Sequence, residues 1–346
     1  MTGTFNFRLI LKVQGALVLI ESLFMSVATL IAYLYGEYDV HGFLLSTLIC
    51  MVGGGLMMLV GWRADARIGR RESYLMVASV WIVFSAFGML PYLLSGAIPA
   101  VWDAFFETMS GFTTTGATIL TDIEVMPHGI LFWRSITQWI GGLGIVLLSL
   151  AILPMFGFGS MQLYTAEATG PTYEKLRPRI RDVAKIMWIL YMLLTAAECV
   201  LLVLNDMDVF DAVCHSFTTM ASGGFSTKNA SIAYFQSPAI QYIIIVFMVM
   251  SGINFSLLYF LIQGKLSRVF RDDEARHYLF AILLFTVLVA VGLMLSHTYA
   301  GTGFSGVEEN VRRSLFHVVA LMTSTGFVTD DYTSWHYVSS PPVAPT

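Results

Sequence analysis

Long apolar stretches separated by short polar ones run along the whole chain. IVFSAFGMLPYLL and IIIVFMVMSGINFSLLYFLI are examples. With its flanks, each is long enough to cross a hydrocarbon core of about 30 Å, because an α-helix rises about 1.5 Å per residue. The pattern therefore predicts an all-α polytopic membrane protein. Its predicted spans lie near residues 9–35, 41–62, 73–96, 129–153, 184–204, 237–262 and 277–297.

The composition supports this class and disfavours several others. Of the 346 residues, 56% are hydrophobic and only 12% are charged, whereas a typical soluble domain carries about 25% charged residues. The net charge of −4 gives no reason to expect a nucleic-acid partner. Cys50, Cys199 and Cys214 are scattered and form no CxxC pair, so we expect buried apolar cysteines rather than a zinc site or disulfides. No cofactor is predicted.

The charges of the connecting loops predict the orientation in the membrane. Basic residues gather at 63–71, 175–185 and 265–276, and acidic residues at 36–39, 121–124, 205–208 and 308–309. Basic loops stay in the cytoplasm, and the two kinds of loop alternate along the chain. We therefore expect a multi-pass protein of the cell (inner) membrane, surrounded by lipid bilayer, with a cytoplasmic N-terminus.

Three apolar segments are too short to span a bilayer. Residues 102–112, 210–220 and 312–322 each contain about ten residues, and a helix of that length covers only about 15 Å. A polar stretch with a central glycine follows each of them. We call these stretches the first, second and third glycine segments: TTTGAT at 113–118, ASGGFS at 221–226 and TSTGFV at 323–328. Each pair predicts a re-entrant hairpin in which a short helix descends from outside and an extended strand returns.

The three hairpins are internal repeats. When Gly116, Gly224 and Gly326 are aligned, other positions match as well. Counted back from the glycine, the matched sets are Asp103, Asp211 and Arg313 at thirteen; Phe106, Cys214 and Phe316 at ten; Glu107, His215 and His317 at nine; Phe112, Met220 and Met322 at four; and Thr114, Ser222 and Ser324 at two. The repeated unit is a span, a short helix, a glycine segment and a second span.

This repeat predicts the organisation of the chain. It begins with a two-helix hairpin and continues with pore repeats joined by cytoplasmic loops. The predicted divisions are a hairpin at 1–72, repeat one at 73–156, a loop at 157–183, repeat two at 184–264, a loop at 265–276, a partial repeat three at 277–337, and a tail at 338–346 with no fourth repeat.

Ion selection explains a glycine repeated at mid-membrane depth. A dehydrated cation needs a ring of oxygens in place of its water, and backbone carbonyls supply these oxygens where glycine permits the required backbone angles. The preceding short helix points its negative dipole end at the cation. The alternative is that each glycine only caps its helix, which explains one copy more easily than three aligned copies. The segments thus predict a carbonyl-lined selectivity filter.

Several motifs together resemble a known family. They are MSGFTTTGAT (109–118), FWRSITQWIGGLGIVLL (132–148), AEATGPTYEKLRPRI (166–180), SGGFSTKNASI (222–232), GINFSLLYF (252–260) and TSTGF (323–327). They recur in order and at the family's spacing, and the likeness covers residues from about 10 to 333. On these motifs the chain resembles the membrane subunit of the Trk/Ktr/HKT potassium transporters, and most closely the TrkH branch.

The resemblance implies potassium uptake, with the potassium ion as substrate and no cofactor. It also implies a homodimer that rests on a cytoplasmic nucleotide-binding ring. Glycine rather than serine at each central position favours potassium over sodium. The residues that the resemblance assigns to the potassium site are Thr114, Thr115 and Gly116, then Ser222, Gly223 and Gly224, then Ser324, Thr325 and Gly326.

The chain departs from the family pattern in its number of repeats. The family has four around one pore, whereas this chain shows two complete copies and half of a third. We therefore expect a chain that is incomplete at its C-terminus, with potassium uptake as the function of the complete parent. The alternative is a truncated, non-transporting fragment that associates with intact subunits.

Other polar residues in apolar surroundings each have two interpretations. Asn254, in the middle of a predicted span, either lines the pore or gate or joins helices by a hydrogen bond. Glu107 either adds negative potential near the pore or makes a structural hydrogen bond. Lys228 either forms a salt bridge or tunes ion entry, and the salt bridge is preferred. Arg134 is expected to anchor a helix end.

A remote alternative is an intramembrane hydrolase. Its motivation is Ser222 and His215 at membrane depth, because a serine nucleophile needs a base within hydrogen-bond reach. The two residues lie on one hairpin with no base from a second element, and a single nucleophile gives no reason for three repeats. The sequence therefore predicts a transporter rather than an enzyme.

Overall fold

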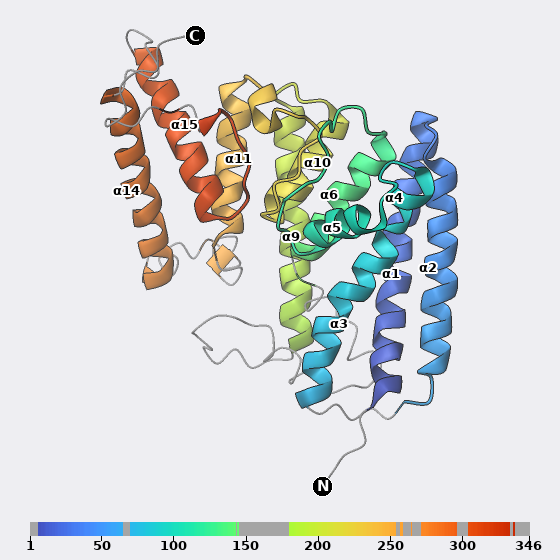
Figure 1. Ribbon diagram of the computed structural model, residues 1–346. Coiled ribbons are helices and arrows are strands. Elements are labelled where there is room, and N and C mark those ends of the chain that lie inside the picture. The colour runs from blue at the N-terminus through green and yellow to red at the C-terminus, as the bar shows by residue number, and fades with distance from the viewer. Residues whose placement is uncertain are drawn as a thin grey trace. The chain divides into compact units, whose positions relative to one another are not determined.

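The computed structural model describes residues 6–64, 70–142, 144, 180–253, 257–258, 264, 271–295, 304–332 and 335. The chain divides into two compact units, Met1–Met192 and Leu193–Thr346. Each is described by itself (Figure 1).

The first unit is entirely helical where it is described. An antiparallel pair, α1 and α2, lies beside the helices that carry the first repeat. The helices are α1 (Phe7–Tyr35), α2 (Val40–Val60), α3 (Arg70–Gly88), α4 (Leu90–Ser95), α5 (Val101–Phe112) and α6 (His128–Gly142), and α9 (Ile180–Val203) contains the boundary between the units. The backbones of α1 and α2 touch where a Cβ on Gly15 would lie only 2.6 Å from the Gly54 carbonyl oxygen, so the GGG motif at 53–55 is a close helix contact, as glycine allows.

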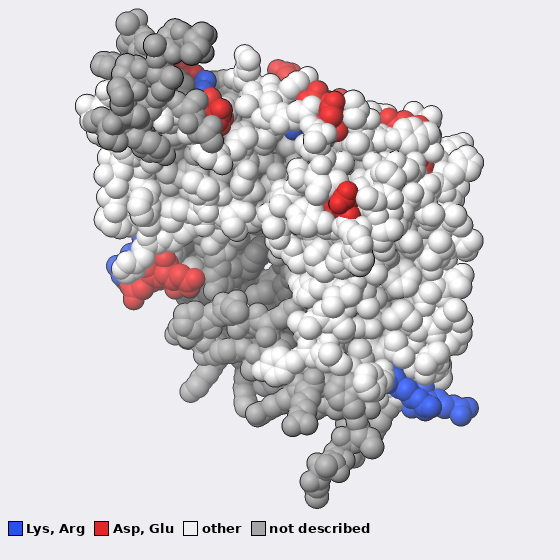
Figure 2. Space-filling view, viewed as in Figure 1, with Lys and Arg blue, Asp and Glu red and all other residues white. Residues whose placement is uncertain are grey.

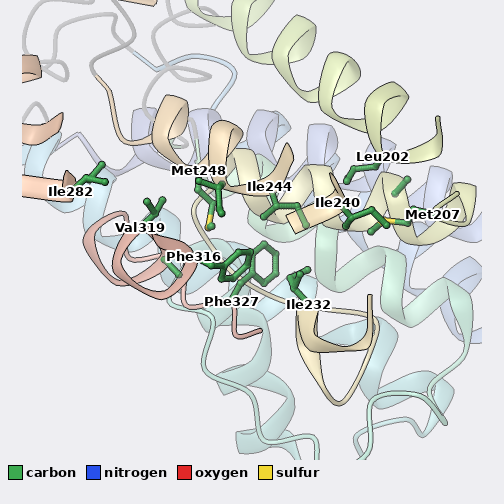
Figure 3. Close-up of a cluster of buried hydrophobic side chains, with 13 residues drawn as sticks. Leu202, Met207, Ile232, Ile240, Ile244, Met248, Ile282, Phe316, Val319 and Phe327 are labelled. Carbon is green, nitrogen blue, oxygen red and sulfur yellow. The ribbon is translucent and has the colours of Figure 1, made fainter. Parts of the chain in front are cut away.

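The second unit is built in the same way around the two later glycine segments. Its elements are α10 (Val209–Met220), the 3₁₀-helix η2 (Ser231–Tyr234), α11 (Pro238–Ser251), α14 (Asp273–Leu295) and α15 (Phe304–Met322). An apolar core joins them (Figure 3), in which Phe316 of α15 and Phe327 of the third glycine segment lie with Ile244 and Met248 of α11. This core holds the third glycine segment against the helices of the second repeat.

Most predicted spans are present as long apolar helices. Within the described residues, five helical stretches are long and apolar enough to cross a membrane: Phe7–Tyr35, Val40–Val60, Tyr74–Ser95, Lys185–Val203 and Asp273–Leu295. The predicted spans 129–153 and 237–262 begin as α6 and α11. The helix α11 ends at Ser251, since Gly252 and Ile253 are no longer helical, and most of the later residues of both predicted spans lie outside the described residues. The helices make this a multi-pass membrane protein. In the first unit, acidic atoms lie mainly toward the end that carries α4, and basic atoms lie at the opposite end (Figure 2).

Two of the predicted short helices have the expected length, and the third is longer. α5 and α10 span 12 residues each, whereas α15 has 19 because it begins at Phe304 rather than near 312. The added turns carry Glu308 and Glu309, which pair with Arg312 at 2.8 Å and Arg313 at 2.6 Å. Acid–base pairs four residues apart stabilise a helix, so they favour extension of α15 beyond the apolar stretch.

Candidate functional site

The three glycine segments have one unusual backbone conformation in common. In each, the central glycine and the residue two positions before it are left-handed. The φ angles are 53° at Thr114 and 75° at Gly116, 52° at Ser222 and 74° at Gly224, and 56° at Ser324 and 76° at Gly326. A left-handed threonine or serine costs about 1–2 kcal/mol. The same strained pattern thus recurs at the positions that the sequence alignment matches.

Threonine hydroxyls brace the first segment from within. Thr113 Oγ1 donates a hydrogen bond to the Met109 carbonyl at 2.7 Å. Thr115 Oγ1 is therefore the donor in the 2.8 Å hydrogen bond between the hydroxyls of Thr113 and Thr115. Ser110 Oγ also donates to the Ala117 carbonyl at 2.6 Å. These bonds join the end of α5 to both sides of Gly116.

The third segment repeats the threonine brace. Thr323 Oγ1 donates to the Val319 carbonyl at 2.8 Å and lies 2.8 Å from Thr325 Oγ1. The second segment has Ala221 and Gly223 at the corresponding positions and lacks both hydroxyls.

A bond to another helix takes the place of the threonine brace in the second segment. Ser222 Oγ lies 3.0 Å from Ser251 Oγ, at the last residue of α11. Because Ser251 donates its own proton to the Met248 carbonyl at 2.8 Å, Ser222 is the donor. No sequence pattern points to Ser251, since nothing in the spacing connects residues 29 positions apart.

The second and third segments lie against each other inside the second unit. A Cβ on Gly224 would overlap the Thr325 carbonyl oxygen. Farther along the chain, the amide of Ala233 in η2 donates to the carbonyl of Val328, at the end of the third segment, at 3.0 Å. Two of the predicted potassium-site segments are therefore brought together, with a backbone carbonyl of one at the central glycine of the other.

A buried ion pair holds the C-terminal end of the first segment. Arg134 Nε donates to Glu107 Oε1 at 2.8 Å, and the two side chains are 1% and 0% exposed. Glu107 also accepts from Thr118 Oγ1 at 2.8 Å and from the Ile119 amide at 3.0 Å. This geometry supports the structural interpretation of Glu107. Arg134 lies within α6, so its role extends beyond anchoring the helix end.

Asp211 and Lys228 take a comparable place in the second repeat. Lys228 Nζ lies 3.2 Å from Asp211 Oδ2, and Thr227 Oγ1 donates to Asp211 Oδ1 at 2.7 Å. Lys228 also lies over the ring of Tyr234, 4.8 Å from its centre. The preferred salt-bridge interpretation of Lys228 is thus confirmed. Asn254 lies outside the described residues.

The positions of Ser222 and His215 contradict the hydrolase hypothesis. Ser222 bonds Ser251, whereas His215 Nε2 lies 2.9 Å from Ser226 Oγ, so the Ser222–His215 pair that this alternative requires does not form. Among the described residues, no group of three or more His, Cys, Asp or Glu side chains could hold a metal ion.

Known proteins with similar sequences and structures are cation transporters. The chain matches the family TrkH, described as cation transport protein, over residues 43–339. It is 39% identical over 333 residues to the Trk system potassium uptake protein TrkH of Escherichia coli K12, and 32% identical over 336 residues to TrkG of the same strain. Those alignments cover 95% and 96% of this chain and 68% of each relative.

A solved structure agrees with this result. The crystal structure of the potassium transporter TrkH from Vibrio parahaemolyticus matches with a TM-score of 0.82 and 34% identity, over 96% of this chain and 68% of that one. The hydrolase hypothesis is therefore wrong at the level of family as well as geometry. The chain belongs to the TrkH family of cation transport proteins.

Proposed function

We propose that this protein takes up potassium across the cell membrane through a pathway whose selective site includes the three glycine segments. The observation that carries the proposal is the left-handed pair at the glycine and two residues before it, repeated in all three segments. A repeated strained backbone marks a ligand clamp more readily than a folding need. The relatives that the chain matches are potassium uptake proteins by name.

The site residues proposed from the sequence fit this role. Backbone carbonyls of Thr114, Thr115 and Gly116, and of the matching residues in the other segments, would replace the water of a potassium ion. The hydroxyl braces hold these carbonyls from behind. Each segment also follows the C-terminal end of α5, α10 or α15, where the helix dipole favours a cation.

The wider architecture is part of the same proposal. We infer re-entrant hairpins arranged with pseudo-fourfold symmetry around one pore, divided along the chain as the repeats predict. The N-terminus lies in the cytoplasm because the basic loops face that side. A homodimer on a cytoplasmic nucleotide-binding ring is the expected assembly, and the basic inner loops are compatible with it.

The chain spans about two thirds of the length of the relatives it matches, 68% of the first, and the proposed activity is that of the full-length gene product.

Rubidium uptake into proteoliposomes tests the proposal. The full-length gene product should take up ⁸⁶Rb⁺, and unlabelled K⁺ should compete more strongly than Na⁺. Gly224→Ser should abolish or strongly reduce uptake, because a side chain there would overlap the Thr325 carbonyl. Gly96→Ser is the matched control, since Gly96 has a similar φ of 76° with nothing within 4 Å. Absence of uptake, or uptake unchanged by Gly224→Ser, would contradict the proposal.

A further inference from the structure

One side chain position links the short helix to the returning strand in every repeat. It is the residue nine positions before the central glycine. In each repeat its side chain reaches a residue two to four positions after that glycine. The pairs are Glu107 with Thr118 at 2.8 Å, His215 with Ser226 at 2.9 Å, and His317 with the Asp330 carbonyl at 3.3 Å. The link is common to the three copies, but its chemistry is not.

The hydrogen bonds of His215 fix which ring nitrogen carries the proton. Nδ1 lies 2.7 Å from the Asp211 carbonyl oxygen, and a carbonyl can only accept, so Nδ1 is protonated. In the neutral ring Nε2 is then an acceptor, and Ser226 Oγ donates to it at 2.9 Å. The Ser226 oxygen in turn accepts from the Lys228 amide at 3.0 Å.

The surroundings of His215 suit a neutral ring. The side chain is fully buried, and the rings of Phe235 and Phe327 lie 5.3 Å and 5.9 Å from it. The nearby charges of Asp211 and Lys228 are paired with each other at 3.2 Å. Since burying an unpaired charge is costly, a neutral histidine is the form that this environment favours.

The hydrogen bond between Ser226 and His215 lies close to Gly224, the central glycine of the second glycine segment. Ser226 stands two residues after Gly224, whose α-carbon faces the Thr325 carbonyl. The segment also lacks the threonine brace present in the other two repeats. The bond from Ser226 to His215 and the bond from Ser222 to Ser251 therefore lie on the two sides of Gly224.

We infer that His215 is a positioning residue for ion selection, which it serves by holding Ser226 through its neutral, Nδ1-protonated ring. The inference rests on the proposed potassium uptake. In the first repeat the buried Glu107–Arg134 pair performs the equivalent task with charges. In the second repeat the His215–Ser226 bond adds no fixed charge of its own, and the nearby charges of Asp211 and Lys228 are paired with each other. His215 does not touch the ion.

A histidine that only fills the core would give a different result from a positioning residue. Replacing a core histidine lowers stability and total uptake, but it leaves the preference among ions unchanged. Loss of a positioning bond lets the carbonyls of the strand shift, so discrimination between Rb⁺ and Na⁺ falls in the molecules that remain folded. The ratio of the two uptake rates separates these roles because it does not depend on the amount of active protein.

The experiment measures that ratio in proteoliposomes of the full-length gene product. His215→Ala and Ser226→Ala should each lower the Rb⁺/Na⁺ ratio roughly fivefold to tenfold, the scale of one lost hydrogen bond. The double variant should be no worse than either single one, because the two residues act as a unit. Ser226→Thr keeps the hydroxyl and should restore the ratio. Ser46→Ala, which removes a buried serine hydroxyl bonded to the Gly42 carbonyl of its own helix, is the control and should leave the ratio unchanged.

Other outcomes would contradict either the role inferred for His215 or the proposed function. A ratio that stays constant while stability falls would reduce His215 to a core residue, and additive effects in the double variant would show that the two residues act separately. If His215→Ala does not fold, Ser226→Ala and Ser226→Thr still test the bond. NMR of the ¹⁵N-histidine-labelled protein should show Nδ1 of His215 protonated and Nε2 unprotonated, and the opposite tautomer would overturn the inference. Complete absence of Rb⁺ uptake by the unaltered protein would instead overturn the proposed function, and this inference with it.

Discussion

The α-carbon of Gly224 lies directly against the carbonyl oxygen of Thr325, and any side chain at residue 224 would overlap that oxygen. Gly224 is also left-handed, with a φ of 74°. Two independent constraints therefore require glycine there: the backbone angle and the approach of a neighbouring strand. The contact joins the second and third glycine segments, which are about one hundred residues apart in the sequence.

This relationship predicts that Gly224→Ala is far more damaging than a similar change elsewhere. The left-handed angle alone costs about 1–2 kcal/mol for alanine, and overlap with the Thr325 carbonyl adds about 1–3 kcal/mol or displaces the strand. We expect loss of Rb⁺ uptake and a lower unfolding temperature. Gly96→Ala has the same cost of a left-handed backbone angle, but a Cβ at residue 96 would have no neighbour within 4 Å. We therefore expect that variant to keep Rb⁺ uptake. Equal effects of the two variants would contradict the close approach.

The buried pair of Glu107 and Arg134 predicts a strong and non-additive response. Removing one partner leaves the other charge buried, which costs about 3–5 kcal/mol. Arg134→Met alone should therefore unfold or severely destabilise the protein, whereas Glu107→Gln with Arg134→Met should be milder. Thermal unfolding in detergent measures both. The exposed pair of Arg276 and Asp273 provides the control, because breaking a surface pair costs less than about 1 kcal/mol. Similar losses at the two pairs would show that the Glu107–Arg134 pair is solvated.

Ser251 predicts a link between α11 and the second glycine segment. Ser251→Ala removes the acceptor of the Ser222 hydroxyl, and the loss should be about 1 kcal/mol or roughly fivefold in Rb⁺ affinity. Ser251→Thr keeps the hydroxyl and should retain affinity. Ser46→Ala, which removes a hydroxyl that bonds the Gly42 carbonyl of its own helix at 2.7 Å, is the control. Affinities that do not differ between Ser251→Ala and Ser46→Ala would count against the link.

Because the carboxyl group of Asp39 is buried, we expect the free energy of unfolding to depend on pH. Asp39 lies outside the membrane-spanning helices. Its side chain is 0% exposed and lies beside Gly129, a residue at the start of α6. Burial, with a smaller contribution from the charge of Glu37, raises the pKa of Asp39 from 3.8 to about 6. A carboxyl whose pKa is higher in the folded protein binds more protons there, so its contribution to the free energy of unfolding falls as pH rises between these two values.

Asp39→Asn should remove this dependence. Above pH 6 the variant should be more stable than the unaltered protein by about 1–3 kcal/mol, and below pH 4 the difference should vanish. Thermal unfolding of both proteins across this range provides the measurement. Asp103→Asn, which changes an exposed acid in the first turn of α5, is the control. A difference that is the same at pH 4 and pH 7 would show that the amide acts by packing rather than by titration.

The all-α membrane class and the recurrence of the glycine segments followed from the sequence because their causes are local. A bilayer of fixed thickness demands long apolar helices, and the helices α1, α2 and α14 lie where the apolar stretches predict. The aligned glycines repeat because a left-handed backbone angle selects glycine wherever it recurs. The same alignment matched Thr114, Ser222 and Ser324, whose shared angle only the structure displays.

What the tertiary structure decided is the set of contacts between distant residues. Periodicity gives no sign that Ser222 bonds Ser251, that Arg134 reaches Glu107, or that His215 holds Ser226 rather than Ser222. Each choice depends on which helix packs against which strand, and several acceptors of equal chemistry lie within a few residues of the true one. The sequence by itself determined that glycine segments recur in a membrane protein. The fold decided what holds each of them in place, because a hydrogen bond depends on position in space and not on separation along the chain.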